Sequence, residues 1–532
     1  MQKFREQNRA ILAEETGTIH KTADFRMALC YPSPYSVAMS SLGYQVIYRI
    51  VNEHKDFVCE RAMLPERPQL WRRSRTPLFT MESETAVSNS DIIAFSVAFE
   101  LELHGIFDVL ELAGLSPFSN QRPEKTPPVL MGGPITLSNP LPLGPFADIV
   151  ILGDAEVAIQ QFLQTYLDAP SKTELLNRCA VLPGFWVPAL HGERTSDTLK
   201  VTKDHVPAYA QIVTPRAELA NMYLIEASRG CPRMCSFCVV RAEVSPMRGS
   251  EPKRVLDLIP DWAPRVGFVG AAVSDYEHIR EIIAGVVAMG KGVGVSSLRA
   301  DRLDEDLVGL LKQGGYRTLT VAADAPSERM RSKIMKGIRE RHLVRAAELA
   351  RWAGFHTLKM YMIIGLPGET QDDIDELLRL CRYLSKIAPL ALTLSPFVPK
   401  LHTPLCDAPF AGIKMVENQI GSIRQALSGQ VDVRAASARW AWVEYRLSQG
   451  GIDTGSAAYE AYRNGGSFGA WKQALDRCGH ERSALDAAQR YALWSPDGLS
   501  RDSRPRPPKP PKRLPWTGFG IHNPAVDMVD NA

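Results

Sequence analysis

The chain has 532 residues, which is too long for one ordinary hydrophobic core and predicts about three domains. Its hydrophobic content of 45%, charged content of 23% and net charge of +3 are typical of a soluble globular protein, without a strong field for nucleic acid. No window approaches the roughly 20 apolar residues of a membrane-spanning helix. The N-terminus lacks the apolar core of a secretory signal, and the nine cysteines do not form a disulfide pattern. We therefore expect a cytoplasmic protein without a membrane partner.

Residues 1–168 are expected to form the first domain. After an N-terminal segment that is expected to be helical or loose, residues 26–168 alternate short apolar runs with helical patterns. Helices are expected at 37–51, 101–113 and 156–167, and strands at 26–31, 57–63, 91–97, 128–132 and 147–152. This alternation predicts an α/β domain with a doubly wound, mainly parallel sheet, whose ligand crevice lies at the carboxyl ends of the strands. Residues 169–221 are expected to form a small strand-containing connector.

Three turns follow the strands of this predicted sheet. They are PSPYS after the first strand, Gly132-Gly133-Pro134 after the fourth and Gly153-Asp154-Ala155-Glu156 after the fifth. Glycine at such positions lets the backbone approach a ligand or a neighbouring loop closely. Each turn alone is more often structural than part of a site.

The sequence CPRMCSFC places three thiols, Cys231, Cys235 and Cys238, directly after an apolar run. Thiolates are soft ligands that suit iron–sulfur clusters or zinc. A structural zinc site normally has four protein ligands, and no fourth Cys or His lies near this loop in the sequence. Three ligands on a four-iron cluster leave one iron open to chelate another molecule. A zinc knuckle or three reduced cysteines are the alternatives.

The CxxxCxxC spacing resembles the signature of the radical S-adenosylmethionine (SAM) superfamily. The resemblance implies that the three cysteines bind a [4Fe–4S] cluster and that SAM binds its open iron. It also implies that Phe237, directly before the third cysteine, lies near the adenine of SAM.

A second β/α series fills residues 222–410. Helices are expected at 277–289, 305–313, 341–353 and 372–387, and strands at 223–227, 266–269, 293–297, 318–322, 357–364 and 391–397. The six units match the partial (β/α)6 TIM-type barrel that the resemblance implies. In such barrels the chemistry takes place at the carboxyl ends of the strands.

Several residues at these strand ends are candidate SAM contacts by the resemblance. Asp275, or nearby backbone carbonyls, would hold the amino group of SAM. Ser297 and Arg299 would bind the ribose hydroxyls and the carboxylate, for which a guanidinium is well suited. Asp324 stands where relatives often have a carboxylate. The alternative for Arg299 is a surface ion pair with Asp301.

The next two strand ends complete the predicted site. Gly365 begins the sequence GLPGET, which recurs in the superfamily as a turn flanking the adenine; here Thr370 would also cap the following helix. The sequence SPFVPKLHTP resembles a loop that closes over the barrel mouth. It makes Lys400 and His402 the predicted substrate contacts.

The first domain resembles the cobalamin-binding-type domain that precedes the barrel in one branch of the superfamily. Members that place a histidine on cobalt carry a DxHxxG motif in the first strand-to-helix loop, whereas the loop at 32–43 contains no histidine. A histidine ligand from this loop is therefore excluded. Tyr35 or a water could face the cobalt, or the domain keeps only the fold.

Residues 411–499 are expected to be helical, with helices at 416–427, 435–448 and 457–463. They resemble the extension of an uncharacterised cobalamin-domain radical SAM family. Trp440, Trp442 and Trp471 are expected in its core. Residues 500–532 contain RPRPPKPPKR and predict an extended linker or tail, with contact to RNA or an acidic partner as the alternative.

The resemblance implies an enzyme that uses a [4Fe–4S] cluster to cleave SAM and start radical chemistry, with a reductant such as flavodoxin or ferredoxin. With cobalamin the implied outcome is methyl transfer; without it, rearrangement, oxidation or RNA modification is open. Methylthiotransferases need three further N-terminal cysteines, and the first domain has only Cys30 and Cys59. An iron–sulfur electron-transfer or scaffold protein is the rival. The sequence does not indicate whether the substrate is a small molecule or a macromolecule.

Overall fold

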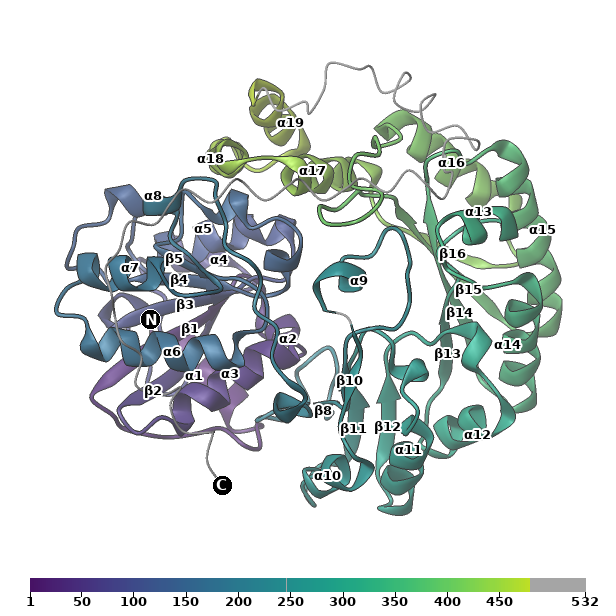
Figure 1. The fold of residues 1–532 in the computed structure, drawn as a ribbon, viewed down its shortest axis with the longest axis horizontal. Helices are drawn as coiled ribbons and strands as arrows, with labels where there is room; N and C mark the ends of the chain where they lie inside the picture. Colours follow the sequence, from purple (N-terminus) through teal and green to yellow (C-terminus); the bar gives the residue numbers. More distant parts are fainter. Residues whose placement is uncertain (245, 479–532) are drawn as a thin grey trace, which may run out of the picture.

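A computed structural model describes residues 1–244 and 246–478. The predicted tail at 500–532 and the end of the predicted helical extension, 479–499, lie outside the described residues. In the described part, two α/β units lie side by side, and three helices cross from the second unit to the first (Figure 1). No helix of the described part is long and apolar enough to cross a membrane.

The first unit is a six-stranded sheet in the order β2-β1-β3-β4-β5-β6. The first five strands are parallel, and β6 pairs antiparallel to β5. The strands are β1 (Phe25–Tyr31), β2 (Phe57–Met63), β3 (Ile92–Ser96), β4 (Val129–Gly132), β5 (Ile149–Ile151) and β6 (Phe185–Trp186). The doubly wound sheet of the sequence analysis is thus present, and β6 extends it into residues 169–221.

Helices cover both faces of this sheet. They are α1 (Gln2–Leu12), α2 (Tyr35–Ala38), α3 (Leu42–Glu53), α4 (Pro68–Arg73), α5 (Leu103–Leu112), α6 (Ala155–Asp168), α7 (Lys172–Ala180) and α8 (Pro188–His191). Alternate residues of β1 join two cores: Leu29 packs with α3 and α6, whereas Cys30 packs with α5. The single helix predicted at 37–51 is wrong, because Ser41 is extended and separates α2 from α3.

The second unit has its strands in the order β7-β8-β11-β12 and β13-β14-β15-β16, and a parallel bridge between Leu298 and Val321 joins the two groups. The six predicted strands are β8 (Tyr223–Glu226), β11 (Arg265–Phe268), β12 (Gly292–Val295), β13 (Thr318–Ala322), β14 (Thr357–Ile364) and β15 (Leu390–Pro396). All neighbours among them are parallel. The partial (β/α)6 barrel is confirmed. The structure adds β7 (Ala208–Tyr209) and β16 (Asp432–Ala435) at its two edges.

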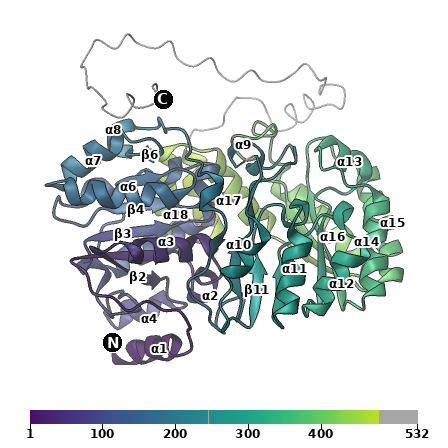
Figure 2. The ribbon, with the colours of Figure 1, turned by 60° about the horizontal axis from the view of Figure 1, so that its bottom comes forward.

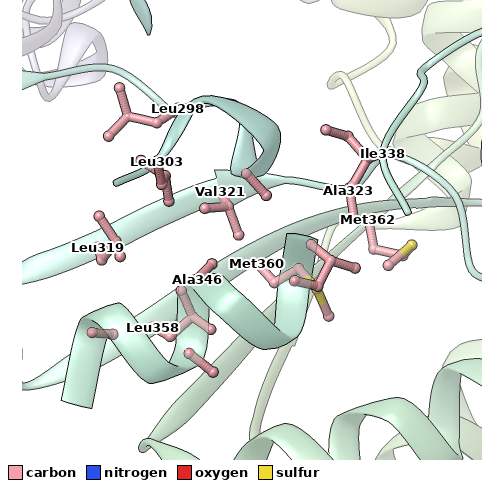
Figure 3. Close-up of a cluster of buried hydrophobic side chains, with 14 of the residues drawn as sticks. Leu298, Leu303, Leu319, Val321, Ala323, Ile338, Ala346, Leu358, Met360 and Met362 are labelled. Carbon is pink, nitrogen blue, oxygen red and sulfur yellow. The ribbon is translucent and has the colours of Figure 1, made fainter. Parts of the chain in front are cut away.

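Helices lie along the outside of these strands (Figure 1 and Figure 2). They are α10 (Pro252–Asp257), α11 (Ile279–Ala288), α12 (Glu305–Gln313), α14 (Glu340–Trp352), α15 (Gln371–Ile387) and α16 (Ile413–Ala426). The core beneath them contains Val321 and Met360 from adjacent strands and Ala346 from α14 (Figure 3). Two short helices, α9 (Val240–Glu243) and α13 (Glu328–Lys333), lie in the loops at the carboxyl ends of the strands.

Helices α17 (Ala438–Gln449), α18 (Ile452–Arg463) and α19 (Phe468–Arg477) brace the two units together. Their apolar side chains, among them Leu447 and Trp471, join the core on the α5 face of the first sheet. The Asn139 side chain donates to the carbonyls of Leu447 and Gly450 at 2.9 and 2.8 Å. The all-helical prediction for 411–499 is wrong at β16, which pairs with β15, and Trp440 is 38% exposed rather than core.

Candidate functional site

The cysteine loop starts at a glycine that no other residue could replace without moving the backbone. Gly230 has a φ of +96°, and a Cβ there would lie 2.6 Å from the carbonyl oxygen of Val244. Two short strands close the loop, β9 (Ser228–Arg229) and β10 (Arg248–Gly249), which pair antiparallel. The glycine and this ribbon set the path of the chain into Cys231.

The three thiols lie on one loop at the carboxyl end of β8. Cys235 is buried, and Cys231 and Cys238 are partly exposed. Burial raises the pKa of the Cys235 thiol, and the positive charges of Lys336 and Arg299 oppose the shift. In residues 1–244 and 246–478, no three His, Cys, Asp or Glu side chains form a ready metal site. The three thiols are soft donors, but the described residues do not hold them in the closed geometry of a metal site.

The cysteine loop packs against two later strand ends. The backbone N–H of Ser236 donates to the carbonyl of Ile334 at 3.0 Å, and that of Leu405 donates to the carbonyl of Ser236 at 3.3 Å. Phe237 packs against a separate apolar cluster formed by Ala325, Met330, Ile334, Leu366, Phe397, Leu405 and Ala408. The structure thus brings Phe237 together with Leu366 of the GLPGET turn.

Asp275 is held by arginines. Its side chain is 1% exposed and accepts from Arg302 Nε at 2.9 Å and Arg233 Nε at 3.2 Å. Burial raises the pKa of Asp275, but these arginines outweigh it and hold the pKa below its usual value. Because Arg233 belongs to the cysteine loop, Asp275 anchors that loop, and its carboxylate already has partners where a SAM amino group was expected.

Arg299 forms the pair that the sequence left as its alternative. It donates to both carboxylate oxygens of Asp301, at 3.0 and 3.1 Å, and to the carbonyl of Lys336 at 2.9 Å. The pair is buried rather than on the surface, since Arg299 is 7% exposed. A SAM carboxylate would have to compete with Asp301 for this guanidinium.

The remaining predicted SAM contacts lie at three strand ends. Ser297 is exposed, two residues beyond β12. Asp324 has a left-handed φ of +61° and an ion pair with Lys336. Gly365 has a φ of +73°, and its N–H donates to Glu369 Oε1 at 3.1 Å.

The two predicted substrate contacts differ in their surroundings. Lys400 Nζ lies 2.8 Å from Glu100 of the first unit and 2.8 Å from Glu444 on α17. Lys400 therefore joins the sheet domain, the barrel and the helical brace, and its ammonium group is already paired. His402 is exposed, with a φ of +62°.

An ionic cluster that the sequence analysis missed lies beside the cysteine loop. Arg229 Nη2 donates to Glu156 at 2.6 Å and to Glu226 at 2.7 Å, and Arg229 Nη1 lies 3.1 Å from Asp154. Arg248 Nη2 lies 3.6 Å from Asp154. The signal was present in the acidic turn at 153–156, which was interpreted only as a glycine turn.

A buried carboxyl was also missed. Glu369 accepts hydrogen bonds from the N–H groups of Gly365 and Leu366 and from the Gln419 side chain, at 3.1, 3.4 and 2.6 Å. Burial raises the pKa of Glu369 to about 7, although these hydrogen bonds oppose the shift. The carboxyl thus supports the turn that carries Leu366.

A cavity of about 350 Å³ separates the carboxyl edge of the first sheet from the cysteine loop. Leu29 of β1 and Ala94 of β3 line it, so it lies at the point where the strand order 2-1-3-4-5 reverses. Open α/β sheets bind ligands at this point. Arg229 and Gly230 line the opposite wall, so the cavity reaches the residue directly before Cys231.

Comparisons with known proteins agree with this architecture. Residues 225–381, which contain the cysteine loop and the GLPGET turn, match the family described as the radical SAM superfamily. Residues 43–188 match the family described as radical SAM proteins, N-terminal.

Two curated relatives are similar in sequence. The uncharacterized protein MJ0966 of Methanocaldococcus jannaschii is 27% identical over 385 residues, which cover 71% of this chain and 78% of the relative. The uncharacterized methyltransferase PH0819 of Pyrococcus horikoshii is 24% identical over 271 residues, 48% of this chain and 58% of the relative.

Among solved structures, the cobalamin-dependent SAM radical enzyme OxsB with aqua-cobalamin bound aligns with a TM-score of 0.47 and 14% identity. The alignment covers 67% of this chain and 52% of OxsB, so the chain spans about half of that enzyme. Methylornithine synthase aligns with a TM-score of 0.31 and 17% identity, over 43% of this chain and 68% of the synthase. On the two matching families, the chain belongs to the radical SAM superfamily and carries the N-terminal domain found in radical SAM proteins.

Proposed function

We propose that the chain is a radical SAM enzyme that binds a [4Fe–4S] cluster through Cys231, Cys235 and Cys238 and acts on a substrate held between its two α/β units. One observation carries the proposal. The cavity at the switch point of the first sheet is closed on its other side by Arg229 and Gly230, which lead directly into the cysteine loop. A substrate in this cavity would lie beside the site of SAM cleavage.

The donor chemistry of the loop fits the cluster. Its three soft thiols suit iron, and a four-iron cluster with three protein ligands keeps one iron open. When bound, such a cluster supplies the single electron that cleaves SAM into methionine and a 5′-deoxyadenosyl radical, which abstracts hydrogen from the substrate. An external reductant of the flavodoxin or ferredoxin class would supply the electron.

The residues around the loop have three tasks in this reaction. Phe237 and Leu366 offer an apolar surface to the adenine of SAM. Asp275 and Arg233 hold the loop in place. Ser297 is exposed at its strand end and is available to a ribose hydroxyl.

The crevice of the first sheet does not fit cobalamin as it stands. The loop at 32–43 has no histidine, and the Tyr35 hydroxyl donates to Glu15 at 2.5 Å and does not line the cavity. The volume of about 350 Å³ is near the lower end of the range for drug-sized ligands, about 300–1,000 Å³, and a corrin with its nucleotide tail is much larger. We therefore favour the cobalamin-independent alternatives, rearrangement or oxidation.

Methyl transfer is the second candidate function, because the relative PH0819 is named an uncharacterized methyltransferase. The test of the main proposal is anaerobic reconstitution with iron and sulfide, followed by reduction in the presence of SAM. We expect 5′-deoxyadenosine from the wild type and none from Cys235→Ala. An intact cluster that releases no 5′-deoxyadenosine would instead favour an electron-transfer or scaffold protein.

A further inference from the structure

The cavity between the two units has walls of mainly apolar side chains. On the sheet side these include Leu130 and Ile151 at strand ends and Val46 on α3. On the barrel side they include Val240 and Val269. A ligand that fills this space binds more tightly because its apolar surface is removed from water.

Charged groups line the cavity at one corner. Asp154 and Glu156 come from the first sheet, and Glu226 and Arg229 come from the barrel. Arg229 contacts all three carboxylates. The nearby Arg248 lies 3.6 Å from Asp154, but it does not line the cavity, and its buried Nε and Nη2 have no hydrogen-bond partner among the described residues. Among the residues that line this corner, three carboxylates face the single guanidinium of Arg229, so negative charge and hydrogen-bond acceptors are in excess. The corner therefore favours a group that donates hydrogen bonds and disfavours an anion.

The size of the cavity sets a second limit. About 350 Å³ accommodates a small molecule and excludes a folded macromolecular segment. The glycines at 132, 133 and 153 lie on its rim, where Gly133 and Gly153 have positive φ values of 113° and 88°. A Cβ at Gly133 or Gly153 would collide with the carbonyl oxygen of Val97 or Leu199, whereas a Cβ at Gly132 would make only an ordinary contact, 3.5 Å from the carbonyl oxygen of Ile151.

We infer that the cavity binds a mainly apolar small molecule with one hydrogen-bond-donating end, an amine or a hydroxyl, which lies against Asp154, Glu156 and Glu226. The inference rests on the proposed function and names the substrate class of that site. It assigns the apolar body of the substrate to the sheet side and its polar end to the ionic corner beside the cysteine loop.

Binding is tested without SAM cleavage, by titration calorimetry of the full chain with octylamine, octan-1-ol and octanoate. Octylamine and octan-1-ol share an eight-carbon apolar chain, and octanoate has one CH2 fewer before its carboxylate, which alone changes affinity by only about 4-fold. We expect the amine and the alcohol to bind at least about 10-fold more tightly than octanoate, since the carboxylate would meet like charges. Octanoate binding as tightly as the amine, or no binding of any probe, would overturn the inference.

A substitution in the cavity wall tests whether the probes bind in this cavity. Ala271 lines the cavity and is itself exposed, so Ala271→Phe fills space without disturbing a core. The matched control is Ala10→Phe at an exposed position on α1. We expect at least about 10-fold weaker binding of both favoured probes to Ala271→Phe and unchanged binding to the control. Equal binding of the probes to both variants would show that they do not bind in this cavity.

Hydroxocobalamin provides the last comparison. If it binds in a one-to-one ratio and displaces octylamine, the cavity is a cofactor site and the inference is wrong. If the chain cleaves SAM but binds no probe, the proposed function stands and only the inference about the substrate class is wrong. If the chain binds the probes but does not cleave SAM, the proposed function is wrong and the cavity still binds the inferred class of small molecule.

Discussion

Glu156, on the turn after β5, accepts a hydrogen bond of 2.6 Å from Arg229, which stands two residues before Cys231. This contact joins the ligand edge of the first sheet to the start of the cysteine loop. Arg229 is the shared partner of three carboxylates, and its side chain is 11% exposed. The position of the loop therefore depends on the sheet domain.

Arg229→Met is expected to lower the free energy of unfolding by about 3 to 5 kcal/mol, because it leaves buried carboxylates without their cation. Urea denaturation measures the change. The control is Arg463→Met, whose partner Glu111 lies 3.5 Å away and whose side chain is 64% exposed. The control is expected to change stability by less than about 1 kcal/mol. Equal changes in the free energy of unfolding would show that the Arg229 cluster stabilises the chain no more than an exposed ion pair does.

Lys400→Met is expected to destabilise the chain by removing the cation between Glu100 and Glu444. Glu100 has a side chain 2% exposed and would be left as an uncompensated charge, at a cost of about 3 kcal/mol. The double variant with Glu100→Gln is expected to recover part of this loss, as thermal unfolding would show. If Lys400 is instead a substrate contact, Lys400→Met would lower activity and leave the unfolding temperature unchanged.

Glu369 predicts a pH dependence of stability. Its pKa in the folded chain is raised to about 7, so between the unfolded value of 4.5 and pH 7 the folded state binds more protons than the unfolded state. Stability from this group is therefore present at low pH and lost as the pH rises through about 7. Relative to Glu369→Gln, the wild type is expected to lose about 2 to 3 kcal/mol between pH 5 and 8. A difference that does not vary with pH would refute the assignment.

Gly230→Ala is expected to move the cysteine loop. Its Cβ would lie within 2.7 Å of the carbonyl oxygens of both Val244 and Pro246, so backbone must shift. The matched control is Gly290→Ala, which also has a positive φ but no atom within 4 Å of the added Cβ. We expect the control to lose only about 1 kcal/mol and to keep its iron. Gly230→Ala is expected to lose reconstituted iron, and full retention of iron would contradict this role.

The two α/β series could be predicted because periodicity and turn residues are local signals. Residues 357–364, for example, form β14 as expected. The strand β16 could not be predicted, because its four residues are strand only through their pairing with β15. The break at Ser41 was missed because the apolar pattern continues across it. The helix is interrupted there only by the extended backbone of Ser41, which the pattern does not show.

The sequence predicted which residues lie at the candidate site, but mostly not which residues they interact with. The cysteine loop followed from motif spacing, and the strand-end residues were implied by the resemblance to the radical SAM superfamily. The pair of Arg299 with Asp301, two residues away, was available from the sequence as an alternative. The partners of Asp275 and Lys400 could not be predicted, because they come from residues far away in the chain, such as Arg233 and Glu100. Arg229 was missed because its three carboxylates come from two different units.

The central claim is that the three thiols of the loop support reductive cleavage of SAM. Its most direct test is the amount of 5′-deoxyadenosine released per chain after anaerobic reconstitution and reduction, for the wild type, Cys235→Ala and the control Cys478→Ala at the end of α19. We predict release by the wild type and by Cys478→Ala, and none by Cys235→Ala. Release by Cys235→Ala equal to the wild type, or none from a wild type with a full cluster, would contradict the account.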